Sequence, residues 1–353
     1  MKAPLSSSLK KLPSRLHVRG SRGLCHGATL LAMIWVICSK RFWFTKPPDV
    51  TLSAPHPSDQ TCVLIISGYD RQSFLSVLVL HYAAMSIIEK VVISWGSAEP
   101  FDFLERVLMK SGPQPKVFIR QEAANDLNLR FRPERSESSS CRIIVDDDIY
   151  LSEQDLLNVF YVWKTHQNQI VGVFPRSHTC VDSAVEGGRM EYISKPLDSY
   201  SMILTKFMVV DNRFLENYFD KGNTALSAGR DLVRRARNCE DIFLNMVVSN
   251  LTRLPPVYVK IRNKIDFGTV QGLYKRPDHA LQRHQCLNSL GQLFVEFPLL
   301  HSYSSLESFA TDAFRRSKKD AEKYLKQALQ HWRNPTLGNL EKTLDYLAHL
   351  PSA

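Results

Sequence analysis

The chain has 353 residues, 44% of them hydrophobic, and a formal net charge of +10 at pH 7. This length is enough for one large core or two modest ones, and 18 Pro with 15 Gly do not indicate a disordered protein. Residues 1–48 contain nine Lys or Arg and no Asp or Glu, which leaves 36 basic against 35 acidic residues in the remainder. Because the body is nearly neutral and shows no basic stripe, we expect no nucleic acid partner.

The N-terminus combines a basic segment at 1–27 with a mostly apolar stretch at 28–44. A cleaved signal peptide would have an apolar core of this length, and an organelle transit peptide would be basic and poor in acid, as this leader is. A spanning helix needs about 20 apolar residues, so an anchor requires Lys40 and Arg41 to snorkel toward the interface. The excess of basic residues before the stretch favours a cytoplasmic N-terminus and a type II signal-anchor, followed by a stem at 45–60.

From Cys62 onward, short apolar runs alternate with amphipathic segments. The expected strands are 63–66, 91–95, 116–120, 142–145 and 170–174, and the expected helices are 73–84, 101–110 and 152–166. Such alternation implies crossover connections and predicts an α/β fold with a mostly parallel sheet. In such a sheet, ligands bind beyond the carboxyl ends of the strands.

After Pro175 the pattern changes to two polar, Gly-containing segments. These precede an expected strand at 200–204 and expected helices at 212–219, 226–236 and 239–250. We expect this part to pack on the same sheet within one catalytic domain at 61–300. The pattern of 305–350 predicts amphipathic surface helices in a C-terminal extension at 301–353.

Three consecutive carboxylates, Asp146, Asp147 and Asp148, follow the apolar run 143–145. Hard cations such as Mn²⁺ and Mg²⁺ prefer oxygen ligands, and one or two protein carboxylates with phosphates make a common site. The alternative is that the aspartates cap the helix that begins near Ser152. The pattern therefore favours either a divalent cation with a nucleotide diphosphate or a helix start.

Other local signals are weaker. Arg71 follows the first strand where a helix begins, which suits a phosphate, although an arginine there is often a surface residue. Seven cysteines are too few for a disulfide framework. Cys62 and Cys141 open apolar strands and are expected to be buried thiols, whereas Cys239 and Cys286 lie in polar surroundings as a plausible pair. The sequon at Asn250 would be glycosylated only in an exposed, lumenal body.

Five stretches together resemble the exostosin-type transferases of glycosyltransferase family 64. They are 64–71 (LIISGYDR), 145–148 (VDDD), 200–204 (YSMIL), 238–242 (NCEDI) and 281–288 (LQRHQCLN). They occur in the family's order over about 61–300. The resemblance implies a GT-A type, Rossmann-like nucleotide-sugar transferase fold with a mostly parallel mixed sheet, a Mn²⁺-dependent retaining mechanism, and a UDP- or GDP-sugar donor.

Carried over residue by residue, the resemblance makes Asp148 the direct metal ligand. Asp146 and Asp147 would be oriented toward the ribose and toward the groups that surround the ion without ligating it directly. The positions that match the family's nucleotide contacts are Arg71, Asn125 and Arg130.

On the acceptor side, Asn238 and Asp241 match a substrate-binding pair, and Arg283 matches an arginine near the departing phosphates. Asp241 is a candidate to accept the proton of the acceptor hydroxyl or to steady positive charge on the sugar, although it also opens an apolar helix. The resemblance pairs Cys239 with Cys286 in a disulfide, which implies an oxidising lumen.

Two departures from the family pattern concern specificity. Gly96 and Ser97 follow Trp95, whereas animal members that act on heparan-type acceptors have paired Asn at these positions. This departure affects a nucleotide contact, so the motif does not indicate which base the donor nucleotide carries. Lys206 follows Leu204-Thr205 where those members have Gly, similar to plant-type members that glycosylate inositolphosphoceramide sphingolipids.

These observations predict an enzyme of the Golgi or endoplasmic reticulum membrane that transfers a hexose or N-acetylhexosamine to a glycan or sphingolipid acceptor. An assembly with itself or with other glycosyltransferases is compatible with this prediction. One alternative is a lumenal nucleotide-binding pseudo-transferase that assists a partner glycosyltransferase. A Mg²⁺-dependent phosphotransferase or nuclease is less favoured, because the chain has no phosphate-cradling glycine loop.

Overall fold

The computed structural model divides into two units, Met1–Thr45 and Lys46–Ala353, and every residue that it describes belongs to the second. The described residues are 61–69, 71–102, 105–106, 116–135, 139–182, 189–196, 198–261, 264–266 and 278–307. The predicted tail, anchor and stem lie outside this set, as do most of the helix expected at 101–110 and residues 308–353. None of the helices in the described ranges is long and apolar enough to cross a membrane.

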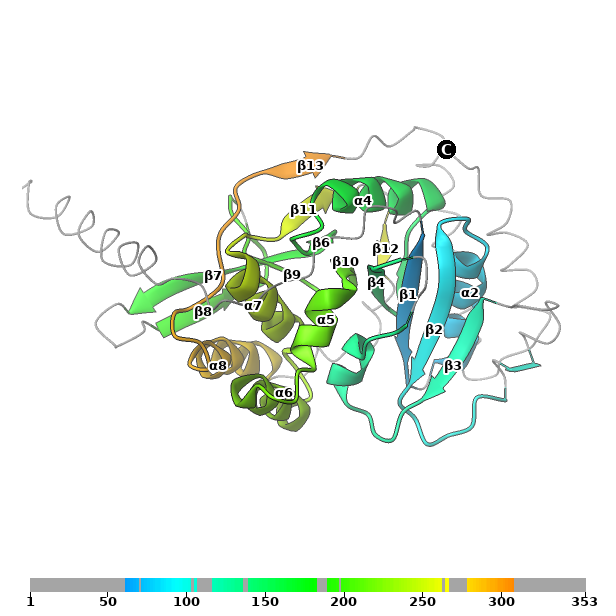
Figure 1. Ribbon diagram of the computed structural model, residues 1–353, viewed down its shortest axis with the longest axis horizontal. Helices are drawn as coiled ribbons and strands as arrows, with labels where there is room; N and C mark the ends of the chain where they lie inside the picture. Colours follow the sequence, from blue (N-terminus) through cyan, green and yellow to red (C-terminus); the bar gives the residue numbers. More distant parts are fainter. Residues whose placement is uncertain are drawn as a thin grey trace, which may run out of the picture. The chain divides into compact units, whose positions relative to one another are not determined.

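An eight-stranded sheet has the order β13-β11-β6-β10-β4-β1-β2-β3 (Figure 1). Its strands are β1 (Cys62–Gly68), β2 (Ile88–Trp95), β3 (Val117–Gln121), β4 (Cys141–Asp146), β6 (Val171–Gly172), β10 (Phe207–Asp211), β11 (Val257–Lys260) and β13 (Ser305–Glu307). Strand β10 is antiparallel to both β4 and β6, and the other neighbouring strands pair in parallel. The predicted fold class, a mostly parallel mixed sheet in an α/β protein, is confirmed.

Both faces of the central strands are buried, which explains their continuous apolar runs. Along β1, Leu64 and Ile66 join one hydrophobic cluster, and Val63 and Ile65 join another. The first cluster includes apolar side chains of α2 (Gln72–Ala83) and α4 (Glu153–Thr165). The second includes those of α5 (Asn212–Tyr218), α6 (Thr224–Ala236), α7 (Glu240–Thr252) and α8 (His279–Gly291). The sheet therefore separates two helical layers (Figure 1).

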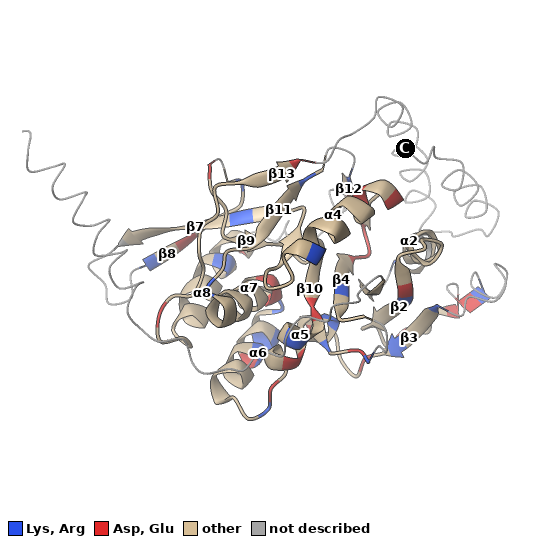
Figure 2. Ribbon diagram, turned by 45° about the horizontal axis from the view of Figure 1, so that its top comes forward, with Lys and Arg blue, Asp and Glu red and all other residues tan. Residues whose placement is uncertain are grey.

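Two smaller sheets extend this framework. One has the order β8-β7-β9, formed by β7 (Pro175–Asp182), β8 (Arg189–Ile193) and β9 (Met202–Ile203). The other pairs β5 (Ile149–Tyr150) with β12 (Ile265–Asp266). Helix α8 docks on β8: the Asn288 side chain bonds both the N–H and the carbonyl of Met190, and His284 Nδ1 accepts from Tyr192 N at 3.0 Å. Acidic and basic residues are interspersed along these elements (Figure 2).

Several expected elements differ from the structure. Only Val171–Gly172 and Met202–Ile203 are strands within the runs predicted at 170–174 and 200–204. A Cβ on Gly172 would lie 2.4 Å from Ile203 Cγ2, so the two short strands approach each other closely at this glycine. Residues 305–307 form strand β13 beside β11, not the start of a helix, because pairing with a neighbouring strand overrides the local pattern. Strand β10 was not predicted.

The prediction that Cys62 and Cys141 are buried thiols is wrong, because they form a disulfide with Cα atoms 4.7 Å apart. Strands β1 and β4 pair in parallel with Val63 opposite Arg142, so the two preceding cysteines lie side by side. Their separation of 79 positions in the chain conceals this proximity.

Candidate active site

The acidic triplet lies where β1 and β4 end together. Ser67 pairs with Asp146, so the residues after these two strands meet at one edge of the sheet. Arg71, the residue preceding α2, donates from Nε to Asp147 Oδ2 at 3.2 Å and from Nη1 to Asp148 Oδ2 at 3.0 Å, and its Nη2 bonds Asp147 Oδ1. One arginine thus bridges two neighbouring carboxylates.

Burial dominates the electrostatics of this cluster. It raises the pKa of Asp147 to about 7, against the opposing charge of Arg71. The pKa of Asp148 is also raised, first by burial and then by the charge of Asp146, while Arg71 and Lys206 oppose the rise. Burial by itself lowers the pKa of Arg71, but Asp147 and Asp148 outweigh it and keep the guanidinium protonated. Because the carboxylates are poorly solvated, additional positive charge at this edge is favourable.

A divalent cation fits the triplet at Asp148. Asp148 Oδ1 is buried and has no hydrogen-bond partner among the described residues. An orphaned carboxylate oxygen is costly, and a hard cation is the ligand that such an oxygen prefers. In the described ranges, no three carboxylate, imidazole or thiol groups converge on one point. Asp148 would hold the ion, with phosphate oxygens and water as its other ligands.

The alternative role of the triplet as a helix cap does not agree with the geometry. Helix α4 is capped by Ser152, whose hydroxyl accepts from Asp155 N at 3.2 Å. The short strand β5 separates the aspartates from this helix, so they do not cap it and are available for a ligand.

Arg130 links the triplet to the second half of the site. It lies in the short helix η1 (Leu127–Phe131), and its Nη1 is 2.7 Å from Asp146 Oδ1 and 3.4 Å from Glu240 Oε1. The hydroxyl of Thr205 donates to the same Glu240 oxygen at 3.1 Å. The donor-side and acceptor-side motifs are therefore parts of one connected site.

Asn125, the remaining candidate nucleotide contact, lies just beyond β3 and is exposed. A Cβ on Gly96 would lie 3.5 Å from the Asn125 Cα, an ordinary van der Waals distance, so the Asn125 loop lies beside the end of β2. Asn125 is thus at the same edge of the sheet as the triplet.

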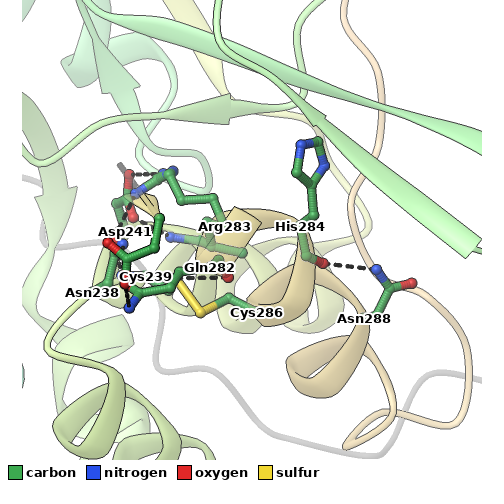
Figure 3. The surroundings of a disulfide bond; sticks show 10 residues. Asn238, Cys239, Asp241, Gln282, Arg283, His284, Cys286 and Asn288 are labelled. Carbon is green, nitrogen blue, oxygen red and sulfur yellow. Dashed lines mark hydrogen bonds and ion pairs between the residues drawn. A yellow bond between two sulfur atoms is a disulfide. The ribbon is translucent and has the colours of Figure 1, made fainter. Parts of the chain in front are cut away.

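The acceptor-side motif centres on a buried ion pair (Figure 3). Arg283 donates from Nη2 to Asp241 Oδ2 at 2.6 Å and from Nη1 to Asn238 Oδ1 at 3.1 Å. Its guanidinium also lies 4.3 Å from the centroid of the Tyr192 ring. Burial opposes the charge of Arg283, but Asp241 and Tyr192 outweigh it, and the pKa of Arg283 is raised.

The backbone at the start of α7 presents these side chains. Cys239 has φ of 75°, in the left-handed region, and it is joined to Cys286 of α8 by the disulfide that the resemblance implies. Asp241 lies in the first turn of α7, where its Oδ1 accepts from Ile242 N while Oδ2 faces Arg283. Asp241 therefore serves the helix start and the ion pair together.

Two arginines of the site keep an unused donor. Arg130 Nε and Arg283 Nε are buried without a partner among the residues that the structure describes. Asp148 Oδ1 is unpartnered in the same way, so the candidate site holds three buried polar atoms whose hydrogen-bonding capacity is unused.

Some residues of this site were not predicted from the sequence. Glu240 was not among the candidate site residues, yet it contacts Arg130, and its pKa is raised by burial against the opposing charge of Arg130. Thr205 and Tyr192 carry no local signal, because their roles depend on contacts across the fold. The position of Glu240 beside Asp241 was the one clue in the sequence.

Comparisons with known proteins identify relatives of this chain. The Glycosyl transferase family 64 domain model matches residues 61–310. Glycosyltransferase family protein 64 C3 of Arabidopsis thaliana is 30% identical over 268 residues, which cover 70% of this chain and 80% of that protein. Exostosin-like 2 of Mus musculus is 30% identical over 259 residues, covering 70% and 76%.

A mannosyltransferase of Pyrobaculum calidifontis in complex with GDP-Man and Mn²⁺ is similar at 13% identity, covering 91% of this chain and 94% of that one. Its TM-score of 0.41 is too low to bear on function. The family model and the relatives carry the assignment, and they confirm the resemblance read from the motifs. The chain belongs to glycosyltransferase family 64 and is a glycosyltransferase.

Proposed function

We propose that this glycosyltransferase is retaining and Mn²⁺-dependent, and that it moves a hexose or N-acetylhexosamine from a UDP- or GDP-sugar. The observation that carries the proposal is the buried, unpartnered Oδ1 of Asp148 beside a carboxylate cluster that Arg71 only partly neutralises. A cation held there would act as a Lewis acid toward the diphosphate leaving group.

The protein's own side chains have distinct roles in this proposal. Arg71 and Arg130 orient the carboxylates and bind the nucleotide, with Asn125 at the edge of its site. The buried guanidinium of Arg283 stays protonated and offers Nε toward the departing phosphates. Asp241, held by Arg283, accepts the proton of the acceptor hydroxyl or balances charge that develops on the sugar.

The acceptor that we propose is a glycan or an inositolphosphoceramide-type sphingolipid. Support for the lipid comes from Lys206, which provides a positive charge next to the triplet where a phosphodiester headgroup would need one. The two disulfides support an oxidising compartment, in line with a Golgi or endoplasmic reticulum lumen. A basic tail at 1–27, an anchor at 28–44, a stem at 45–60 and an extension at 301–353 complete the proposed organisation.

The first test is a donor screen on the full-length protein, purified in detergent with Mn²⁺. A ligand bound by the folded form alone raises stability by about 2.7 kcal/mol at 100 times its Kd, so the correct nucleotide should shift the Tm. UDP is compared with GDP, and each matching nucleotide sugar is then assayed for release of the diphosphate.

Asp148→Asn should lower this release by about 100-fold or more, because several kcal/mol of leaving-group stabilisation are removed. The matched control is Asp198→Asn at an exposed position, which should retain wild-type turnover. Full activity of Asp148→Asn would refute the proposed metal ligand. Nucleotide binding without turnover on any donor would instead identify an assistant of a partner transferase.

A further inference from the structure

Lys206 lies in the turn between β9 and β10, directly against the end of β4. Its carbonyl accepts from Asp146 N at 3.2 Å, and the next residue, Phe207, pairs with Val145. The turn is thereby held in register with the first aspartate of the triplet. This register, and not proximity in sequence, brings Lys206 to the site.

The Lys206 ammonium makes an ion pair that does not belong to the triplet. Nζ donates to Asp266 Oδ2 at 2.5 Å. Asp266 reaches this place because β12 pairs with β5, which puts it opposite Ile149, the residue after Asp148. The side chains of Lys206 and Asp266 are 22% and 28% exposed, so both are accessible to a ligand.

The basic side chains around the triplet differ in which carboxylates they pair with. Arg71 is held by Asp147 and Asp148, and Arg130 is held by Asp146 and Glu240. Lys206 alone of these three is paired with a carboxylate outside the catalytic motifs. A lysine carries a compact charge on a flexible four-carbon stem, so it exchanges one anionic partner for another more readily than a bidentate arginine.

The charge balance of the loaded site favours such a group. A nucleoside diphosphate brings at least two negative charges to an edge that already holds three consecutive carboxylates, Asp146, Asp147 and Asp148. One divalent cation would neutralise only part of the total. A mobile ammonium beside the ion would neutralise part of the remaining negative charge. In the protein without bound nucleotide sugar, it would not add a fixed, buried charge.

We propose that Lys206 is a phosphate-binding residue of this site. When the substrate binds, the Lys206 ammonium moves away from Asp266 and contacts a phosphate of that substrate. The phosphate belongs either to the donor diphosphate or to the phosphodiester of an acceptor headgroup. This inference rests on the proposed function and adds a specificity-determining residue to it.

The test uses full-length protein and calorimetric Kd values in two arms. The donor arm titrates UDP and GDP in the presence of Mn²⁺, and the acceptor arm titrates inositol 1-phosphate. Lys206→Met should weaken binding roughly 10- to 100-fold in one arm, the loss expected for a charged hydrogen bond. Lys206→Arg should recover part of the affinity. Asp266→Asn should tighten binding severalfold, because the lysine no longer has to leave a partner.

Lys264→Met is the matched control. Lys206 and Lys264 lie 5.7 Å and 5.4 Å from the centroid of the same Phe174 ring, but Lys264 Nζ donates to the carbonyl of Ile261. This control should bind both probes as the wild type does.

A merely structural ion pair would give a different result. Lys206→Met and Asp266→Asn would then lower the Tm by similar amounts and leave both Kd values unchanged, which overturns the role of Lys206 while the proposed transferase reaction stands. A wild-type protein that binds no nucleoside diphosphate and turns over no nucleotide sugar would overturn the proposed function, and the role of Lys206 with it.

Discussion

At the level of single residues, the site is organised by arginine–carboxylate pairs. Glu240 and Asp241 are consecutive at the start of α7, yet each faces a different arginine, Arg130 and Arg283 respectively. Both carboxylates are less than 9% exposed. Buried charges of this kind persist when paired and become costly when one partner is removed.

The Arg283–Asp241 pair therefore gives a stability prediction. Arg283→Met leaves the Asp241 carboxylate buried and uncompensated, and should lower the free energy of unfolding by about 3–5 kcal/mol. The double variant Arg283→Met/Asp241→Leu should be more stable than the single Arg283→Met. Urea unfolding of the wild type, both single variants and the double variant measures the coupling between the two residues. Additive effects would show that the pair contributes nothing by itself.

At the level of elements, the packing of α6 on α7 depends on one glycine. A Cβ on Gly229 would lie 2.0 Å from Cζ of Phe243, a buried ring of α7. Phe243 is surrounded by other aromatic side chains, including Tyr218 and Phe294. The ring has little room to move, so the two helices would have to separate.

Gly229→Ala should consequently destabilise the protein by about 1–3 kcal/mol, the usual cost of overpacking a core, although alanine favours helices. Gly222→Ala is the control, because that glycine is exposed and its Cβ would meet only Asp220 Oδ1 at 3.3 Å. Urea unfolding of the two variants should show a clear loss for Gly229→Ala and a change within about 0.5 kcal/mol for Gly222→Ala. Equal effects would contradict the close helix contact.

The Cys62–Cys141 disulfide joins the first residues of the neighbouring strands β1 and β4. It closes a loop with a sequence separation of 79, and its loss should lower the free energy of unfolding by about 2–4 kcal/mol. Either single replacement by Ala abolishes the bridge, so Cys62→Ala, Cys141→Ala and the double variant should unfold at similar urea concentrations. A double variant twice as destabilised as each single one would mean that side-chain packing, not the bridge, is the source.

For the whole molecule, buried titratable groups of opposite sign determine how stability depends on pH. Burial lowers the pKa of His81 to about 4 and that of His178 to about 3, so the unfolded chain binds their protons below about pH 6.5 and the native protein does not. Burial raises the pKa of Asp147 and Glu240, and these groups favour the native state as the pH falls. The two sets partly cancel in the wild type.

A substitution of His178 isolates the contribution of this one histidine to the pH dependence of stability. His178→Asn retains a partner for the Ser201 hydroxyl, which lies 2.7 Å from His178 Nδ1, but does not titrate. Relative to this variant, the wild type should lose about 1.4 kcal/mol of unfolding free energy for each pH unit between about 6 and 4. The measurement is urea unfolding of both proteins at several pH values. A difference that is independent of pH would show that the imidazole titrates normally.

The alternating elements of the first half, and the position of the aspartates at the end of β4, could be predicted from the chain alone. Hydrophobic periodicity and strand termini are local properties, so a single chain is sufficient to reveal them. The same holds for α5, α6 and α7, whose predicted ranges agree with the structure to within a few residues.

Contacts between residues far apart in the chain, by contrast, became known from the folded arrangement. Strand β10 enters antiparallel between β4 and β6, and that register brings Lys206 beside the triplet. The Arg130–Glu240 contact and the Cys62–Cys141 bridge join positions 110 and 79 residues apart. No local pattern encodes such pairings, because they depend on how whole strands align and on the free energy of burying their charges together.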